Sequence, residues 1–167
     1  GRAIGAQQMV DWSHRMGFGR PTGIDLPNEA SGHVPRPEAL QTIRLAGADD
    51  AAQEARKASQ WYPGNTLGLA IGQASLTVTP LQIARLMAAI ANDGELVTPT
   101  VVRDVRDRAT GSSLDLQRGP SSRNVGLTDR TLKYVREGLE QVVASKRGTG
   151  HRTVFSKEIT IAGKTGT

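Results

Sequence analysis

The chain alternates between segments whose hydrophobic residues recur at helical spacing and segments dense in glycine and proline. In residues 4–16, Met9, Trp12 and Met16 fall on one side of a helix, and Gly17 can end that helix in a left-handed conformation. The spacing therefore predicts a short helix, followed by a loop over residues 17–23.

The strongest helical pattern lies in residues 79–93. Thr79 suits the N-cap, Pro80 the first helical position and Gly94 the left-handed position after the last turn. Between these ends the segment is apolar on nearly every side, and four polar residues interrupt it: Gln82, Arg85, Asn92 and Asp93. Because a helix that is apolar all round is buried, we expect this segment to be the central helix of the core.

Two other segments carry helical signals. A helix capped by Thr128 is expected over residues 129–145, and its apolar face consists of Leu132, Val135, Leu139, Val142 and Val143. A further helix is expected from about Pro37 to Ala46, and residues 48–60 form a weakly amphipathic segment after it.

Extended structure is expected in the second half of the chain. Alternating valines predict strands within residues 96–106, separated at Pro99. Residues 108–126 are polar and rich in turn formers, which predicts a surface excursion, and residues 158–164 are typical of a strand that enters a glycine-rich end. Helices around a buried helix, together with short strands, predict an α+β fold.

Composition narrows the chemistry. The chain has 167 residues, enough for one domain, with 37% hydrophobic and only 4% aromatic residues. This content is lean for a globular core, so we expect the chain to share its core with further segments. It has no cysteine, which excludes disulfides and thiol nucleophiles, and no stretch typical of a membrane span or a signal peptide.

The net charge of +5 is concentrated in one half of the chain. Residues 1–100 hold 8 Lys and Arg against 9 Asp and Glu, whereas residues 101–167 hold 13 against 7. A solvated basic surface and attraction of an anionic partner both account for this excess. The basic half has only Tyr134 and Phe155 as aromatic residues, so we expect no nucleic-acid partner.

The last six residues, 162–167, include the string Lys-Thr-Gly. A phosphate-binding loop would need glycine five residues before Gly163, where Glu158 stands, so we reject that interpretation. A plain strand end with turn glycines stays open for so short a string. The third interpretation is the Lys-Thr-Gly box of serine penicillin-recognising enzymes, whose lysine supplies positive charge and whose last residue offers a hydroxyl and an N–H to a carboxylate and an oxyanion.

Several longer strings decide between these interpretations: GFGRPTGIDLP at 17–27, WYPGNT at 61–66, AIGQ at 70–73, VTPLQIAR at 78–85, ANDG at 91–94 and AGKTGT at 162–167. In order and spacing they resemble class B penicillin-binding proteins, and most of all the elongation-type penicillin-binding protein 2. The chain departs from that pattern at Asn28 and Ala74, where the family commonly has glycine.

The resemblance implies a partial penicillin-binding transpeptidase fold of the serine β-lactamase-like type, with helices packed on an antiparallel sheet that is incomplete in this chain. It implies a peptidoglycan D,D-transpeptidase that cross-links stem peptides ending in D-Ala-D-Ala through a serine acyl-enzyme, and that β-lactam antibiotics trap. Lys164 and Thr167 would be catalytic, and Thr165, Gly166 and Thr167 would bind substrate. No metal or organic cofactor is implied. The domain would be periplasmic, on an inner-membrane-anchored protein, with cell-elongation proteins as partners.

The nucleophilic serine of that family lies in a Ser-x-x-Lys box, and no such string occurs in this chain. We therefore expect the nucleophile upstream and the last strands downstream, so that residues 1–167 form part of one transpeptidase domain and are inactive alone. A non-catalytic sensor or cell-wall scaffold, and a serine β-lactamase-like hydrolase, are the alternatives. The three histidines are isolated and lack the spacing of metal ligands: His14, His33 and His151.

Overall fold

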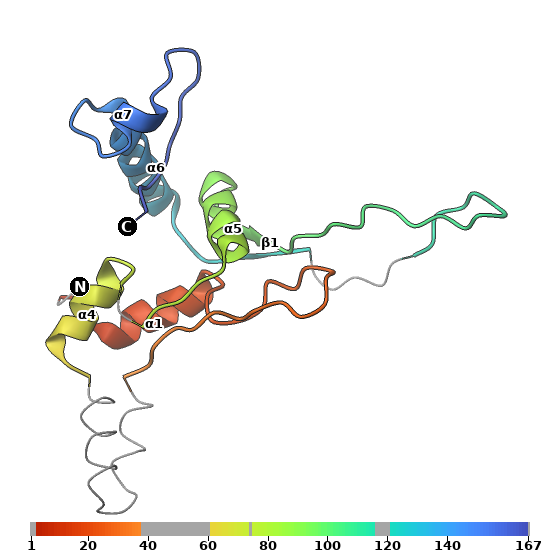
Figure 1. Cartoon of the computed structure of the whole chain (residues 1–167), viewed down its shortest axis with the longest axis horizontal. Coiled ribbons are helices and arrows are strands. Elements are labelled where there is room, and N and C mark those ends of the chain that lie inside the picture. Colours follow the sequence, from red (N-terminus) through yellow and green to blue (C-terminus); the bar gives the residue numbers. More distant parts are fainter. Residues whose placement is uncertain (1–2, 38–60, 74, 116–120, 167) are drawn as a thin grey trace, which may run out of the picture. The chain divides into compact units, whose positions relative to one another are not determined.

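The computed structural model describes residues 3–37, 61–73, 75–115 and 121–166. The helices and strands assigned in these ranges are, in order, α1 (Ala6–Arg15), α4 (Pro63–Ala70), α5 (Pro80–Ala91), β1 (Glu95–Val97), β2 (Ser122–Asn124), α6 (Asp129–Ala144) and α7 (His151–Val154) (Figure 1). They belong to two compact units, residues 1–84 with 98–119 and residues 85–97 with 120–167. The helix expected from Pro37 to Ala46 and the segment 48–60 lie outside the described residues.

The first unit packs α1 and α4 on a small apolar core. Val10, Val34 and Leu69 are buried there, and four partly buried residues pack against them: Met9, Phe18, Trp61 and Leu76. Helix α1 confirms the first predicted helix, whereas α4 was not predicted. The indole N–H of Trp61 donates to Thr66 Oγ1 at 2.8 Å. This bond links α4 to Trp61, which packs against the core.

Helix α5 begins with a reciprocal capping box. The N–H of Gln82 donates to Thr79 Oγ1 at 3.1 Å, and Gln82 Oε1 accepts from the Thr79 N–H at 2.9 Å. The other end of the same amide donates from Nε2 to the carbonyls of Arg20 and Ser31, both at 2.8 Å. These bonds hold the glycine-rich loop of residues 17–31 against the start of the helix.

The bounds of α5 confirm the predicted helix, but its predicted burial is wrong. Gln82, which the sequence pattern treats as an interruption, is only 1% exposed, whereas Ile83 is 47% exposed. Ala84, Ala88 and Ala91 are exposed as well. The Gln82 amide is buried because it hydrogen-bonds to the loop of residues 17–31. Among the described residues, nothing covers the neighbouring apolar face of α5.

Two of the left-handed residues in the loop after α1 bear on its turns, Gly32 and Asn28. Gly32 has φ of 64°, and a Cβ there would lie 2.5 Å from the carbonyl oxygen of Thr77. That close approach is fixed by the paired hydrogen bonds between His33 and Thr77, at 2.8 and 2.9 Å. Asn28, where the resemblance described above would favour glycine, has φ of 61°. Asparagine tolerates this conformation better than most residues, so the departure preserves the turn.

A carboxylate organises the chain after Pro99. Asp25 accepts from Thr100 Oγ1 at 2.6 Å and from the N–H groups of Val101 and Val102 at 2.7 and 3.1 Å. These donors, with the Thr100 hydroxyl foremost, lower the pKa of Asp25 to about 2. No strand is assigned within residues 98–106, so the strand predicted after Pro99 is wrong, because Asp25 takes the backbone donors that a ladder would use.

The second unit contains a two-stranded antiparallel sheet, and α6 follows it along the chain. Strand β1 confirms the strand predicted before Pro99 and pairs with β2, with Leu96 opposite Arg123. Leu96, Val125 and Leu132 are almost fully buried. Strand β2 lies where a surface excursion was predicted, and its three residues are all exposed.

Helix α6 confirms the helix predicted over residues 129–145. The N–H of Thr131 donates to Oγ1 of the predicted cap, Thr128, at 3.2 Å. Leu132 and Val143 of its apolar face are buried, while Val135 is 37% exposed. No helix in the described ranges is long and apolar enough to cross a membrane.

Candidate functional site

The Lys-Thr-Gly segment, residues 164–166, follows α7 and a turn in the second unit, and the chain leading to it runs back beside α6 (Figure 1). The N–H of Gly163 donates to the carbonyl of Leu139 on α6 at 3.0 Å. The predicted strand over residues 158–164 is not formed. A strand requires a neighbour to complete its ladder, and no described segment pairs with this one.

Lys164 contacts Thr165, and Thr165 contacts the loop that follows α6. The exposed ammonium group of Lys164 donates to the carbonyl of Thr165 at 2.7 Å. The hydroxyl of Thr165 lies 3.0 Å from the hydroxyl of Thr149. No serine hydroxyl within the described part of the chain hydrogen-bonds to Lys164, so the described residues contain no complete acyl-transfer site.

Beside Gly166 the backbone is open. A Cβ at this position would meet no heavy atom within 4 Å. No described residue therefore blocks this side of the backbone. Thr167, the other predicted site residue, lies outside the described residues.

The turn between α6 and α7 approaches the helix end closely. The N–H of Gly148 donates to Ser145 O at 2.7 Å, and the N–H of Gly150 donates to Val142 O at 3.0 Å. A Cβ at Gly148 would lie 2.2 Å from the carbonyl oxygen of Val142, so only glycine fits there. His151 Nδ1 lies 2.8 Å from the carbonyl of Val143. The sequence shows the basic excess of this half of the chain but not the contact of Thr149 in this turn with Thr165.

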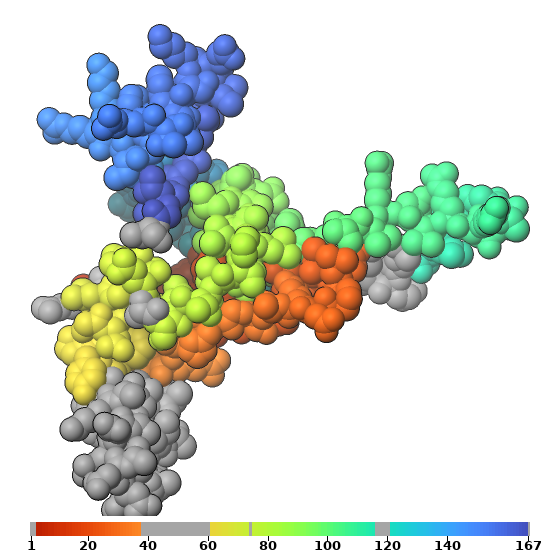
Figure 2. Space-filling model, in the orientation of Figure 1, coloured from red at the N-terminus to blue at the C-terminus, as the bar shows by residue number. Residues whose placement is uncertain are grey.

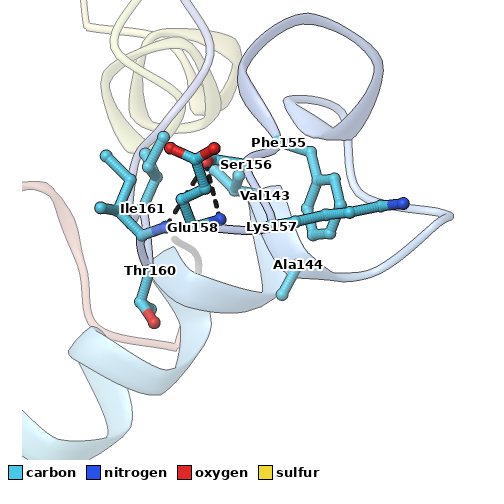
Figure 3. Close-up of a pocket in the computed structure, with 9 residues that line it drawn as sticks. Val143, Ala144, Phe155, Ser156, Lys157, Glu158, Thr160 and Ile161 are labelled. Atoms are coloured by element: carbon cyan, nitrogen blue, oxygen red, sulfur yellow. Dashed lines mark hydrogen bonds between the residues drawn. The ribbon is translucent and has the colours of Figure 1, made fainter.

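A hollow of about 170 Å³ lies just before the Lys-Thr-Gly segment. Val143 and Ala144 form its α6 side, and residues 155–161 form the rest (Figure 3). Ser156 Oγ accepts from the N–H groups of Glu158 and Ile159 at 3.1 and 3.4 Å, which shapes the turn. The hollow mixes apolar and charged side chains and presents no recognisable catalytic set.

Serine penicillin-recognising enzymes also carry a Ser-x-Asn box. One such string occurs in the chain, Ser122-Arg123-Asn124, and it was not recognised from the sequence. It forms β2. The Asn124 amide donates to Glu95 Oε1 at 2.9 Å and accepts from the Gly126 N–H at 2.7 Å. This side chain therefore closes the turn after β2, which is a structural role.

The histidines also have structural contacts. His14 Nδ1 lies 3.2 Å from the carbonyl of Phe18, His33 forms the backbone bridge to Thr77, and His151 bonds to α6. In the described part of the chain, no three side chains of the metal-binding types gather in one place.

Comparisons with known proteins agree on one family. The family described as penicillin binding protein transpeptidase domain matches residues 1–167. The peptidoglycan D,D-transpeptidase MrdA of Acinetobacter baumannii is 35% identical over 165 residues, which cover 98% of this chain and 22% of that protein.

Two solved structures show the same likeness. A complex of penicillin-binding protein 2 and MreC from Helicobacter pylori matches with a TM-score of 0.68 and 28% identity, over 96% of this chain and 25% of that one. Penicillin-binding protein 3 from Mycobacterium tuberculosis, complexed with ampicillin, matches with a TM-score of 0.66 and 28% identity, over 89% of this chain and 28% of that one. The chain thus spans about a quarter of the length of these relatives.

Proposed function

Because this chain belongs to the penicillin-binding protein transpeptidase domain family, we propose that it is part of a peptidoglycan D,D-transpeptidase. The single observation that carries the proposal is the likeness to MrdA of A. baumannii over 98% of the chain. The resemblance to class B penicillin-binding proteins and the partial α+β fold, both predicted from the sequence, are confirmed. We also propose that residues 1–167 form only part of the transpeptidase domain.

In the proposed reaction, a serine hydroxyl from a Ser-x-x-Lys box outside this chain attacks the carbonyl carbon of the penultimate D-Ala of a stem peptide. The peptide C–N bond breaks, and the terminal D-Ala leaves as the amine, taking the serine proton. The amine of a neighbouring stem peptide then attacks the ester, forms the cross-link and returns a proton to the serine. A β-lactam acylates the same serine.

Lys164 supplies positive charge and helps proton transfer in this proposal. The exposure of the Lys164 ammonium group supports this role. Its hydrogen bond to Thr165 O would have to break before the ammonium group could approach the catalytic serine. Thr165 and Thr167 would bind the substrate carboxylate, with the Thr167 N–H in the oxyanion hole. The open side of Gly166 supports a peptide lying along this segment.

The resemblance to class B penicillin-binding proteins also implies a location and partners. We propose a periplasmic domain on an inner-membrane-anchored protein that works with cell-elongation proteins and binds β-lactams. The complex of the Helicobacter protein with MreC supports the elongation partners, and the ampicillin complex of the Mycobacterium protein supports the antibiotic.

The test is intact-mass analysis after incubation with benzylpenicillin, made on the longer protein that carries this chain and on the 167-residue chain itself. We expect one stable penicilloyl adduct on the longer protein and none on the chain. Rapid loss of the adduct would favour a β-lactamase-like hydrolase. No adduct on a folded longer protein would favour a non-catalytic sensor or scaffold, and an adduct on the chain would place the nucleophile among its own serines.

A further inference from the structure

Residues 146–153, which we call the cationic loop, carry positive charge without a matching negative charge. From Ser145 to the Lys-Thr-Gly segment there are five basic residues and one acidic residue: Lys146, Arg147, Arg152, Lys157, Lys164 and Glu158. The ion pairs described for the second unit lie elsewhere, on α6 and at Asp93. No cation of the loop pairs with a carboxylate in the part of the chain that the structure describes.

These side chains face solvent. Lys146, Arg147 and Arg152 are all exposed, and Figure 2 shows long side chains standing clear of the blue surface that the carboxy-terminal segment forms. The ammonium group of Lys157 points away from the neighbouring Glu158 (Figure 3). Among the described residues, the loop therefore presents cations with no anionic partner.

The backbone beneath them is fixed. Gly148 and Gly150 donate to carbonyls at the end of α6, and His151 bonds to Val143 O. Because these bonds use the backbone and one ring, the basic side chains do not help to hold the turn. The basic side chains project from this turn.

Attraction to the negative end of the α6 dipole explains only some of these basic residues. A cation near a helix carboxy terminus is favourable, and Lys146 and Arg147 follow the last residue of α6 directly. The effect fades beyond the last turn, so it gives no reason for Arg152 on α7 or for Lys157. A surface that only needed solubility would mix both signs of charge.

The loop is tied to the candidate carboxylate-binding segment. Thr149 meets Thr165 with 3.0 Å between the hydroxyl oxygens. Arg147 and Arg152 stand two and three residues from Thr149 in sequence, which is at most about 11 Å of extended chain. A peptide that reaches Thr165 thus passes within reach of a long basic side chain.

From this arrangement we propose that the cationic loop binds a second carboxylate of the donor peptide, in addition to the terminal carboxylate assigned to Thr165 and Thr167. The proposal rests on the function proposed above and names a substrate class for it: donor peptides that keep a free carboxylate at an internal residue. Arg147 and Arg152 suit such a group because a guanidinium can donate two parallel hydrogen bonds to a carboxylate.

The experiment compares two donor peptides that differ only at one internal residue, a free acid in one and a primary amide in the other. The longer protein is assayed for release of D-Ala, as wild type, as a loop double variant (Arg147→Gln with Arg152→Gln) and as a matched control (Arg130→Gln with Lys133→Gln). The control removes the same charge from exposed positions of α6. Benzylpenicillin acylation is measured on all three proteins.

For the wild type we expect kcat/KM to favour the free acid about tenfold, the size of two exposed charge pairs. The loop variant should lose most of that preference through KM, with kcat and penicillin acylation unchanged, and the control should keep it. In the wild type, raising the salt concentration should weaken the preference.

Several results would overturn the proposal: no preference in the wild type, a preference that survives in the loop variant, or an equal loss in the control. If any of these occurs while benzylpenicillin still acylates the protein, the loop assignment fails and the transpeptidase proposal stands. Absence of acylation in the wild type would overturn both.

Discussion

The buried amide of Gln82 leads to a prediction about stability that is opposite to the one from the hydrophobic pattern alone. Replacing Gln82 by Met keeps the length of the side chain and removes its hydrogen bonds to Thr79 N, Arg20 O and Ser31 O. The hydrophobic pattern alone predicts that an apolar residue at this helical position stabilises the core. The structure predicts the opposite, because Gln82 joins a loop to the start of α5.

The magnitude follows from the three lost bonds. Each neutral hydrogen bond contributes about 1 kcal/mol net, and a buried partner left without one costs about 1–3 kcal/mol. A methionine in the same place recovers roughly 1 kcal/mol by burying apolar surface. The net expectation is a loss of about 2–4 kcal/mol, which lowers Tm by about 6–12 °C for a chain of this size.

Urea denaturation and thermal melting of the folded protein measure this loss. Gln8→Met is the matched control, because Gln8 is exposed on α1, and we expect it to change stability by less than about 0.5 kcal/mol. A Gln82→Met variant whose stability stays within that same margin, or an equal loss of stability in both variants, would contradict this role of the Gln82 amide.

Four further predictions concern other contacts. The lowered pKa of Asp25 means that its carboxylate contributes stability fully above about pH 5 and loses it as the pH falls towards 2, so Asp25→Asn should flatten the pH dependence of unfolding over that window, measured by urea titration. Thr128→Ala should destabilise by about 1 kcal/mol through loss of the α6 cap, and Thr128→Ser, measured beside it, should not. Gly148→Ala should cost about 1–3 kcal/mol and increase amide exchange in the loop, since the added methyl meets a carbonyl of α6; exchange equal to wild type would contradict this. Lys164→Gln should slow benzylpenicillin acylation of the longer protein at least about 100-fold with an unchanged melting curve, and a wild-type acylation rate would remove Lys164 from the proposed site.

The helices that the sequence predicts best are those with both a cap and an apolar face. Thr79 and Thr128 mark the starts of α5 and α6, and the observed bounds agree with the prediction within two residues at each end. Local signals are enough in these cases because the bonds that start a helix lie within four residues of one another. Strand β2 escaped prediction for the opposite reason. Its three residues are polar and exposed, and only their pairing with β1, which is distant in sequence, makes them a strand.

Burial on α5 and the surroundings of the Lys-Thr-Gly segment could not be predicted either. Nothing in the local pattern indicates that Gln82 would meet Arg20 O, 62 residues away. The string at residues 164–166 was recognisable, but its neighbour Thr149 lies 16 residues earlier, in a loop whose composition indicated only charge. Contacts of this kind depend on where a turn places its backbone, and a single sequence does not contain that information.

The turn after α6 divides its positions into two kinds with different freedom to change. Gly148 and Gly150 are bound to the helix end through their backbone, so a replacement at Gly148 disturbs the fold. Lys146 and Arg147 take no part in those bonds, so their replacement leaves the turn intact. Mutation can therefore alter the charge beside the Lys-Thr-Gly segment at little folding cost. In a lineage whose substrate or inhibitor changes, this loop is a place where adaptation can proceed one side chain at a time.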